Sequence, residues 1–100
     1  MFMPRGDSET LRKLSGVFQV LSDETRLRII QALEKRELSV SDIAKTLNVS
    51  QPAISHQLRT LRQMDLVRER RVGQRVYYRI ADKHIFRIIE DGLDHVRERR

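Results

Sequence analysis

Residues 39–66 read SVSDIAKTLNVSQPAISHQLRTLRQMDL, and this stretch decides the fold. Ser39 is a good helix N-cap, and Asp42 three residues later can complete a capping box. Apolar residues then recur at the spacing of one helical face. They stop at Asn48, a residue type that tolerates the left-handed conformation of a sharp helix end. The pattern predicts two short helices joined by a tight turn, which is a helix-turn-helix.

The second helix of this pair separates apolar from polar side chains. It begins at Ser50, a good N-cap, and carries Pro52 in its first turn, where a missing N–H costs nothing. The inward-facing residues are Ile54, Leu58, Leu61 and Leu66. The outward-facing residues are Gln51, Ser55, His56, Arg59 and Arg62. In a helix-turn-helix, such a helix lies in the DNA major groove with its N-terminal residues at the base edges.

Length and composition favour one small domain. The chain has 100 residues, 39% of them hydrophobic and 5% aromatic, so a modest core of Leu, Ile and Val is expected. It has no apolar run near the length of a membrane span, and residues 1–9 (MFMPRGDSE) lack the apolar core of a signal peptide. With no cysteine there is no disulfide framework, thiolate metal site or thiol redox switch. We therefore expect a cytoplasmic protein.

The positive charge is concentrated beside the helix-turn-helix. The net charge is +6, and residues 50–80 contain seven arginines against two acids, whereas bases and acids cancel over residues 82–100. A local arginine excess of this kind favours phosphate binding. A merely solvated basic surface is the alternative.

The flanking segments predict a scaffold around this motif. After a flexible N-terminus at residues 1–7, apolar spacing predicts a helix over 8–21 that carries Gly16 near its buried side, and a second helix over 24–34. A short connection at 35–38 then leads to the helix-turn-helix, so that residues 8–100 form one domain.

After Leu66 the hydrophobic period changes to two. Residues 67–72 and 75–80 read as two strands around Gly73-Gln74, and so predict a β-hairpin over 67–80. A hairpin directly after the second helix is the wing of a winged helix-turn-helix. Its tip can reach the DNA minor groove or backbone, and a ribbon that only stabilises the domain is the alternative.

Asp82 can cap a last helix over 82–99. Its apolar surface is wider than a small domain needs to bury a terminal helix, which favours a partner helix. The residues of that surface are Ile85, Phe86, Ile88, Ile89, Leu93 and Val96. We expect a mainly α fold with a small β-hairpin, which forms a homodimer through its first and last helices. Dimerisation would place two reading helices in successive major grooves of an inverted-repeat operator in double-stranded DNA.

The ordered set of phrases resembles the ArsR/SmtB family of bacterial metal-sensing repressors. The resemblance rests on LSDETRLRIIQAL at 21–33, ELSVSDIAKTLNVSQPAISHQLRTLR at 37–62 and GQRVYYRI at 73–80, and it covers roughly residues 10–98. It implies a winged helix homodimer, built through the first and last helices, that holds operator DNA without metal and leaves it when metal binds.

The family's alternative metal sites can be compared with this sequence. One needs the cysteines of ELCVCDL, where this chain has ELSVSDI with Ser39 and Ser41 in their place. Because a serine hydroxyl is a poor ligand for soft or borderline metals, we expect no sensing of arsenite, antimonite, cadmium or lead there. Cysteine-based persulfide sensing is excluded as well.

The other site has the pattern D-x-H-x10-H-x2-[H/E] on the last helix, and this chain matches it at Asp82, His84, His95 and Glu98. His84 and His95 share a helix face, but at ~1.5 Å per residue they lie roughly 16 Å apart. One helix cannot bring both to a single ion, whereas two antiparallel copies can, which makes two symmetric sites per dimer. Two nitrogens and two carboxylates suit Zn(II), with Co(II) possible and Ni(II) third. Taken singly, each residue reads more simply as a cap or a solvated side chain.

These observations predict a metal-responsive repressor, with a metal-independent DNA-binding regulator carrying a vestigial metal site as the alternative. The residues expected at bases and nearby phosphates are Gln51, Ser55, His56 and Arg59. Those expected at phosphates or on the wing are Ser50, Arg62, Arg71, Gln74 and Arg75. A small zinc hydrolase is disfavoured, since four protein ligands leave no open metal position. We therefore predict no enzymatic activity.

Overall fold

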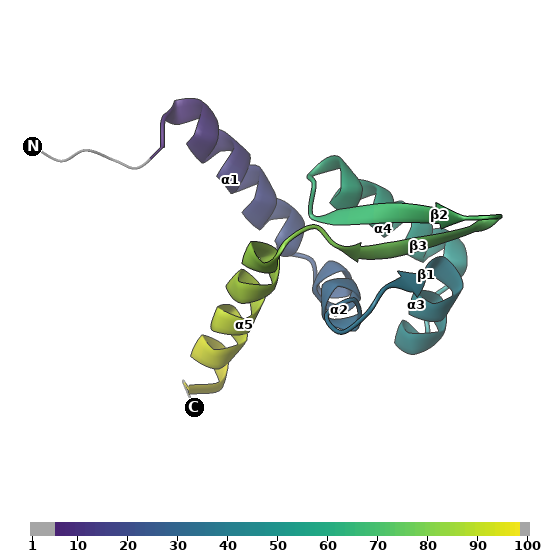
Figure 1. The fold of residues 1–100 in the computed structure, drawn as a ribbon. Coiled ribbons are helices and arrows are strands. Elements are labelled where there is room, and N and C mark those ends of the chain that lie inside the picture. Colours follow the sequence, from purple (N-terminus) through teal and green to yellow (C-terminus); the bar gives the residue numbers. More distant parts are fainter. Residues whose placement is uncertain (1–5, 99–100) are drawn as a thin grey trace, which may run out of the picture.

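The computed structural model describes residues 6–98 of the chain, which form five helices and three strands (Figure 1). In chain order the elements are α1 (Ser8–Leu21), α2 (Glu24–Ala32), β1 (Leu38–Ser39), α3 (Val40–Leu47), α4 (Gln51–Gln63), β2 (Val67–Val72), β3 (Arg75–Ile80) and α5 (Lys83–Glu98). The N-terminus predicted to be flexible falls largely outside the described residues, as does Arg99 at the predicted end of the last helix.

Side-chain caps start the helices at the predicted places. The Ser39 hydroxyl accepts from the Asp42 N–H at 3.2 Å while the Asp42 carboxylate accepts from the Ser39 N–H at 3.4 Å, which completes the capping box of α3. Asn48 ends α3 with a left-handed φ of 57°. The Ser50 hydroxyl accepts from the Ala53 N–H at 3.3 Å and starts α4. These local contacts produce the helix-turn-helix expected from residues 39–66.

The sheet has three strands, one more than predicted. Its order is β1-β3-β2, and Leu38 and Ser39 pair with Tyr78 and Tyr77 in antiparallel register. The predicted connection at 35–38 therefore extends into a strand, and α2 ends at Ala32 rather than near residue 34. A two-residue strand is too short to show period-two alternation, so it escapes sequence analysis.

One apolar core joins the three helices of the motif to the base of the hairpin. Ile54, Leu58 and Leu61 on α4 are 0% exposed, and Leu66, also predicted to face inward, is 1% exposed. They pack in one cluster with Ile43 of α3 and with buried residues of α2 and β2. Full burial of this single stripe fixes which sides of α4 remain open.

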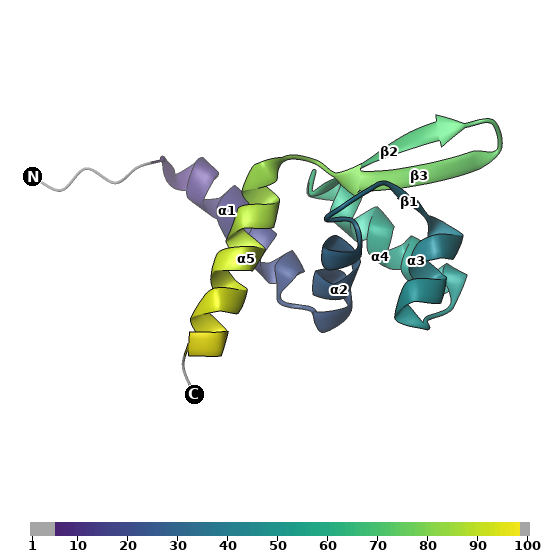
Figure 2. The same ribbon diagram turned by 60° about the horizontal axis from the view of Figure 1, so that its bottom comes forward.

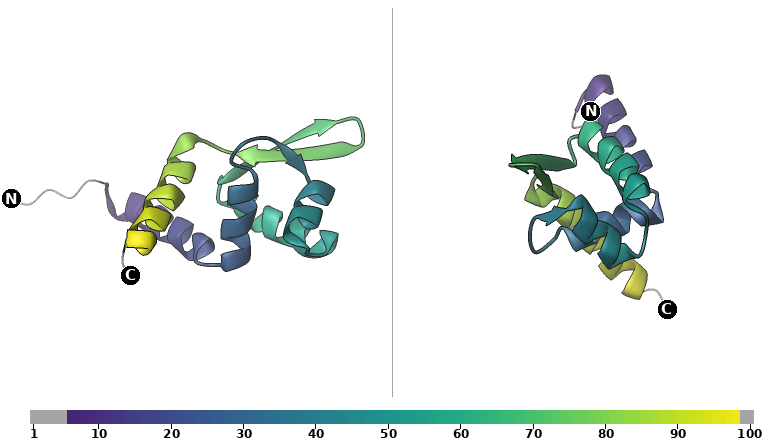
Figure 3. Two further views of the ribbon diagram at one scale, coloured as in Figure 1. Left: turned by 90° about the horizontal axis from the view of Figure 1, so that it is seen from below. Right: turned by 90° about the vertical axis from the view of Figure 1, so that its right-hand side faces the viewer.

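The helices α1 and α5 lie at one end of the molecule, and α3 and the hairpin tip lie at the other (Figures 1 and 2). Helix α2 stands between these ends (Figure 3). Gly16 of α1 faces the end of α4, since a Cβ at this position would stand 2.9 Å from the Met64 Cε. Gly16 is half-buried, in agreement with its predicted place near the buried side of this helix.

The α1/α5 end carries apolar side chains that the chain itself does not cover. Phe18 is 51% exposed and Val96 is 69% exposed. An apolar groove of about 610 Å³, lined partly by Leu27 and Leu93, lies between α1, α2 and α5. Among residues 6–98, no helix is long and apolar enough to cross a membrane.

Truncation of the α4 stripe tests this account of the core. We expect Ile54→Ala to lower the free energy of unfolding by about 2–5 kcal/mol, because it leaves a cavity at a fully buried position. Gln63→Ala, an exposed change in the same helix, should stay within about 0.5 kcal/mol of wild type. Urea denaturation followed by circular dichroism measures both, and equal midpoints for the two variants would contradict the assignment.

Candidate nucleic-acid interface and metal site

Helix α4 presents the predicted DNA-reading residues to solvent. Gln51, Ser55, His56 and Arg59 are all exposed, because the core takes the stripe on the opposite side of the helix. Ser50, also exposed, is the N-cap of the helix. The first turn of α4 therefore has both free side chains and the partial positive charge of a helix N-terminus.

A polar cleft joins the start of α4 to the hairpin. Its volume is about 360 Å³, and it is lined partly by Gln51 and Ser55 of α4 and by Gln74 and Arg75 beside the hairpin tip. Four residues predicted from two separate stretches of sequence thus lie around one depression. A DNA strand that follows the first turn of α4 would meet the hairpin on this side.

The hairpin tip is narrow and exposed. Strands β2 and β3 pair from Val67↔Ile80 to Val72↔Arg75, which leaves a two-residue turn. Gly73 occupies its first position with a φ of 61°, a conformation that suits glycine and that a two-residue hairpin turn requires. Arg71 and Arg75 remain exposed at the tip, as a wing that contacts phosphates requires.

Arg62, a predicted phosphate contact, has an acidic partner within the chain. Its Nη1 lies 2.8 Å from the Glu69 Oε1 on β2, and the Tyr78 hydroxyl donates to the Glu69 Oε2 at 3.2 Å. Burial, together with the nearby Glu69 carboxylate, raises the pKa of Tyr78. Arg62 therefore links the end of α4 to the wing.

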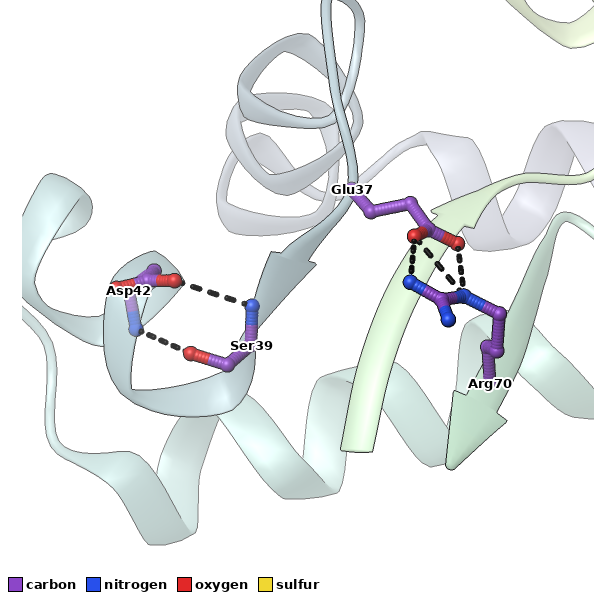
Figure 4. A network of polar contacts seen from close by, with 4 residues as sticks. All are labelled: Glu37, Ser39, Asp42 and Arg70. Carbon is purple, nitrogen blue, oxygen red and sulfur yellow. Dashed lines mark hydrogen bonds and ion pairs between the residues drawn. The ribbon is translucent and has the colours of Figure 1, made fainter. Parts of the chain in front are cut away.

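A second ion pair holds the wing from its other side. The Arg70 guanidinium of β2 donates to the Glu37 carboxylate, with its Nη2 at 2.6 Å from the Oε1 (Figure 4). This hydrogen bond lowers the pKa of Glu37, and Arg70 also lies 5.7 Å from the centre of the Tyr77 ring. Both Glu37 and Glu69 were missed in the sequence, because their partners are 33 and 7 residues away and no local spacing indicates them.

The start of α3 holds two hydroxyl groups rather than thiolates. The Ser39 and Ser41 Oγ atoms lie 3.2 Å apart. The Ser39 hydroxyl already caps α3 by accepting from the Asp42 N–H (Figure 4). The hydrogen bonds that the Asp42 carboxylate makes with Ser39 lower the pKa of Asp42. The donor set at this place therefore suits helix capping rather than a soft metal.

The predicted metal ligands lie at the two ends of α5, and all four are exposed. Asp82 caps the helix by accepting from the N–H groups of His84 at 2.9 Å and Ile85 at 3.3 Å, and the His84 Nδ1 lies 3.3 Å from the same carboxylate oxygen. His95 and Glu98 stand at the far end. Within residues 6–98, no group of three or more potential ligands comes together in one chain. A single subunit thus brings together only the two halves of the predicted set.

A half-buried polar link, which the sequence did not predict, joins α2 to α4. The Arg26 Nε of α2 donates to the Gln57 Oε1 of α4 at 2.7 Å, and its Nη1 donates to the Val20 carbonyl of α1 at 3.2 Å. The two side chains are 31 residues apart, so only the packing of α2 on α4 reveals the contact.

Comparison with known proteins extends this description. Residues 23–69 match the model of a family described as "Bacterial regulatory protein, arsR family". The "Transcriptional repressor SmtB homolog" of Synechocystis sp. is 44% identical over 87 residues, which cover 87% of this chain and 66% of that protein, or just under two thirds of its length. The "Cadmium resistance transcriptional regulatory protein CadC homolog" of Staphylococcus aureus is 37% identical, with 85% of this chain and 71% of that protein covered.

A solved structure shares the whole architecture. The homodimeric winged helix-turn-helix DNA-binding domain of Mb0332 from Mycobacterium bovis has a TM-score of 0.84 and 28% sequence identity, and the match covers 98% of this chain and 93% of that one. The predicted winged helix-turn-helix fold is therefore confirmed.

The interface on α4 predicts a salt-dependent effect of Arg59. Arg59→Ala should weaken DNA binding and lower the slope of log K against log salt by about 0.9 for each phosphate that the variant no longer neutralises. Arg12→Ala removes the same charge from an exposed position of α1, outside the cleft and the hairpin, and should leave the slope unchanged. Fluorescence anisotropy on duplex DNA at several salt concentrations measures both variants. Equal slopes for Arg59→Ala and wild type would contradict the contact.

Proposed function

This chain belongs to the ArsR family of bacterial regulatory proteins, which are DNA-binding transcriptional regulators and not enzymes, and from that premise we propose that it is a metal-responsive repressor. It binds operator DNA as a metal-free homodimer and is released when Zn(II), or Co(II), binds between the two α5 helices. The observation that carries the proposal is the separation of Asp82 and His84 from His95 and Glu98 along one exposed helix.

The apolar α1/α5 end supports the homodimer. The end away from the wing exposes apolar side chains and carries the groove that Phe18 and Val96 help to line. The other exposed apolar residues there are Leu11 and Leu14. A second copy of the same surface would bury these side chains, and a two-fold dimer presents the same patch on both subunits.

The charges on α5 support an antiparallel pairing of the two helices. At ~100° per residue, Arg87 and Asp91 lie roughly on the face that carries His84 and His95. If the two antiparallel α5 helices pair so that His84 lies beside the partner's His95, then Arg87 lies within one residue of the partner's Asp91. Within the described part of the chain these two side chains form no ion pair with each other, although they are four residues apart. One arrangement thus satisfies both the ligands and the charges.

The donor set fits the proposed ion. Asp82 and His84 of one subunit and His95 and Glu98 of the other offer two imidazole nitrogens and two carboxylates, which suit a tetrahedral divalent ion such as Zn(II). A bound ion would supply a fixed link between the two helices. Asp82 is already positioned by its capping bonds, so the Asp82–His84 half is ordered before any partner arrives.

Release from DNA requires that α5 influence α4. We place this coupling at the end of the recognition helix, where Met64 caps α4, Asp65 adopts a left-handed φ of 57° and Gly16 of α1 packs closely. A ligating histidine usually donates its other N–H to a second acceptor. By family resemblance, His95 would donate to a backbone carbonyl near Met64 and Asp65. The bound state then favours a subunit orientation that fits successive DNA grooves less well.

Zinc binding tests the ligand assignment with an internal control. Equilibrium dialysis at neutral pH should find about one zinc per wild-type subunit and a loss of tight binding in His84→Ala. His56→Ala, which removes the third histidine of the chain from α4, should keep zinc binding and lose DNA affinity instead. If wild type does not bind zinc tightly, the chain is a metal-independent regulator.

A separate variant tests the transmission. His95→Glu keeps a side-chain oxygen that can reach the ion and has no N–H to donate. We expect it to retain zinc while DNA binding, measured by anisotropy on an inverted-repeat duplex, stops responding to zinc. A normal zinc response in a variant that still binds zinc would refute the role of His95.

A further inference from the structure

The predicted DNA contacts on α4 leave one flank of the helix unassigned. Gln51, Ser55 and Arg62 face the hairpin, as the shared cleft and the Arg62–Glu69 pair show. Gln57 is two residues from Ser55 and from Arg59, so at ~100° per residue it lies roughly 160° around the helix from both. A helix in a major groove has a phosphate backbone on each side, and the hairpin flank faces only one of them.

On this flank, Gln57 has side-chain donors that bond to no other residue among 6–98. Ala53 has no polar side-chain group, and the Thr60 hydroxyl donates to the His56 carbonyl at 3.4 Å. Gln57 is half-buried and accepts from Arg26 at 2.7 Å. Because a guanidinium has no acceptor, the amide oxygen of Gln57 must face Arg26 and its NH₂ group must point elsewhere. This fixes the orientation of the amide by chemistry.

Arg26 is held in place and keeps its positive charge. Its Nη1 donates to the Val20 carbonyl in the last turn of α1, where the helix end carries partial negative charge. Among residues 6–98, no carboxylate forms an ion pair with its guanidinium, and the Asp23 carboxylate accepts from its backbone N–H instead. A cation bonded to the amide oxygen makes the amide N–H groups stronger donors.

We propose that Gln57 is an additional DNA-binding residue, whose amide donates to a backbone phosphate on the side of the major groove opposite the wing, and that Arg26 is the positioning residue that holds it there. The inference rests on the proposed DNA binding by α4. It gives the recognition helix a phosphate contact on both flanks, with the wing on one side and the Arg26–Gln57 pair on the other. The same pair attaches α1 to α4 through Val20.

The Gln57→Glu variant distinguishes a DNA contact of Gln57 from a purely structural role of the Arg26–Gln57 pair. The variant keeps an acceptor for Arg26 and gains an ion pair, so its thermal midpoint should equal or exceed that of wild type. It also loses both donors and places a negative charge at the phosphate. We expect its affinity for an unrelated 30-base-pair duplex and for an operator selected from a random pool to fall by about tenfold or more, and equally for both DNAs.

Gln19→Glu is the matched control, since it makes the same charge change at an exposed position of α1, away from the DNA-facing side of α4. Its affinity for both duplexes should stay within about threefold of wild type. Equal affinities for the two variants would refute the Gln57 contact while leaving the proposed function intact. Failure of wild type to bind either duplex at low salt would instead refute the proposed function.

A second measurement keeps the test valid if Gln57→Glu does not fold. In wild type, the side-chain amide resonances of Gln57 can be assigned by their absence in Gln57→Met and followed by NMR on addition of the unrelated duplex. We expect them to shift together with the backbone amides of the first turn of α4. Unchanged Gln57 resonances at DNA saturation would overturn the proposal.

Discussion

The burial of one apolar stripe on α4 is the constraint on which the proposed DNA-binding surface depends. Ile54, Leu58 and Leu61 leave no exposed area, so the helix cannot rotate about its axis without opening the core. This fixes the direction of every other side chain on α4. The same contact turns Gln51 and Ser55 toward the hairpin and turns Gln57 toward α2. The positions of the side chains proposed to contact DNA are therefore set by the packing of the buried stripe beneath them.

The wing depends on electrostatics more than on packing. Only Val67 of β2 is buried, so the strand is held beyond its base by pairing with β3 and by two ion pairs. Glu69 and Arg70 are adjacent and so point to opposite faces of the strand, one toward Arg62 and the other toward Glu37. Exposed pairs of this kind contribute little stability, but two on opposite faces restrict the hairpin orientation relative to α4. Arg62 thus has a partner already when DNA arrives.

The sequence predicted most of what local chemistry controls. The capping box at Ser39, the left-handed Asn48, the start of α4 at Ser50 and the extent of both hairpin strands follow from residues close to one another in the chain. The strand β1 was missed because its two residues are defined by their partner in β3, not by their own pattern. The contacts at the candidate site that the sequence did not predict were missed for the same reason: they depend on a partner from another element. Arg26–Gln57 and Glu37–Arg70 join residues 31 and 33 positions apart, and each exists because two elements pack at a particular angle. The ligand pattern of α5 could be found in the sequence for the opposite reason, since all four residues belong to one helix and its cap.

Helix α1 does more than support the helix-turn-helix. It contributes Leu11, Leu14 and Phe18 to the apolar end. It also approaches the end of α4 through Gly16 at Met64, and Arg26 of α2 links its Val20 carbonyl to Gln57 of α4. A change in how two subunits meet at α1 and α5 therefore reaches α4 at its end and on one flank. Glycine at position 16 leaves room for the Met64 methyl group, which a Cβ there would force to shift. Helix α4 is fixed by its own core within the subunit, so in the proposed dimer a change at the interface would move it together with α1 and α2. In the proposed mechanism, release from DNA requires only a change in the distance or angle between the DNA-binding units of the two subunits, without any unfolding of α4.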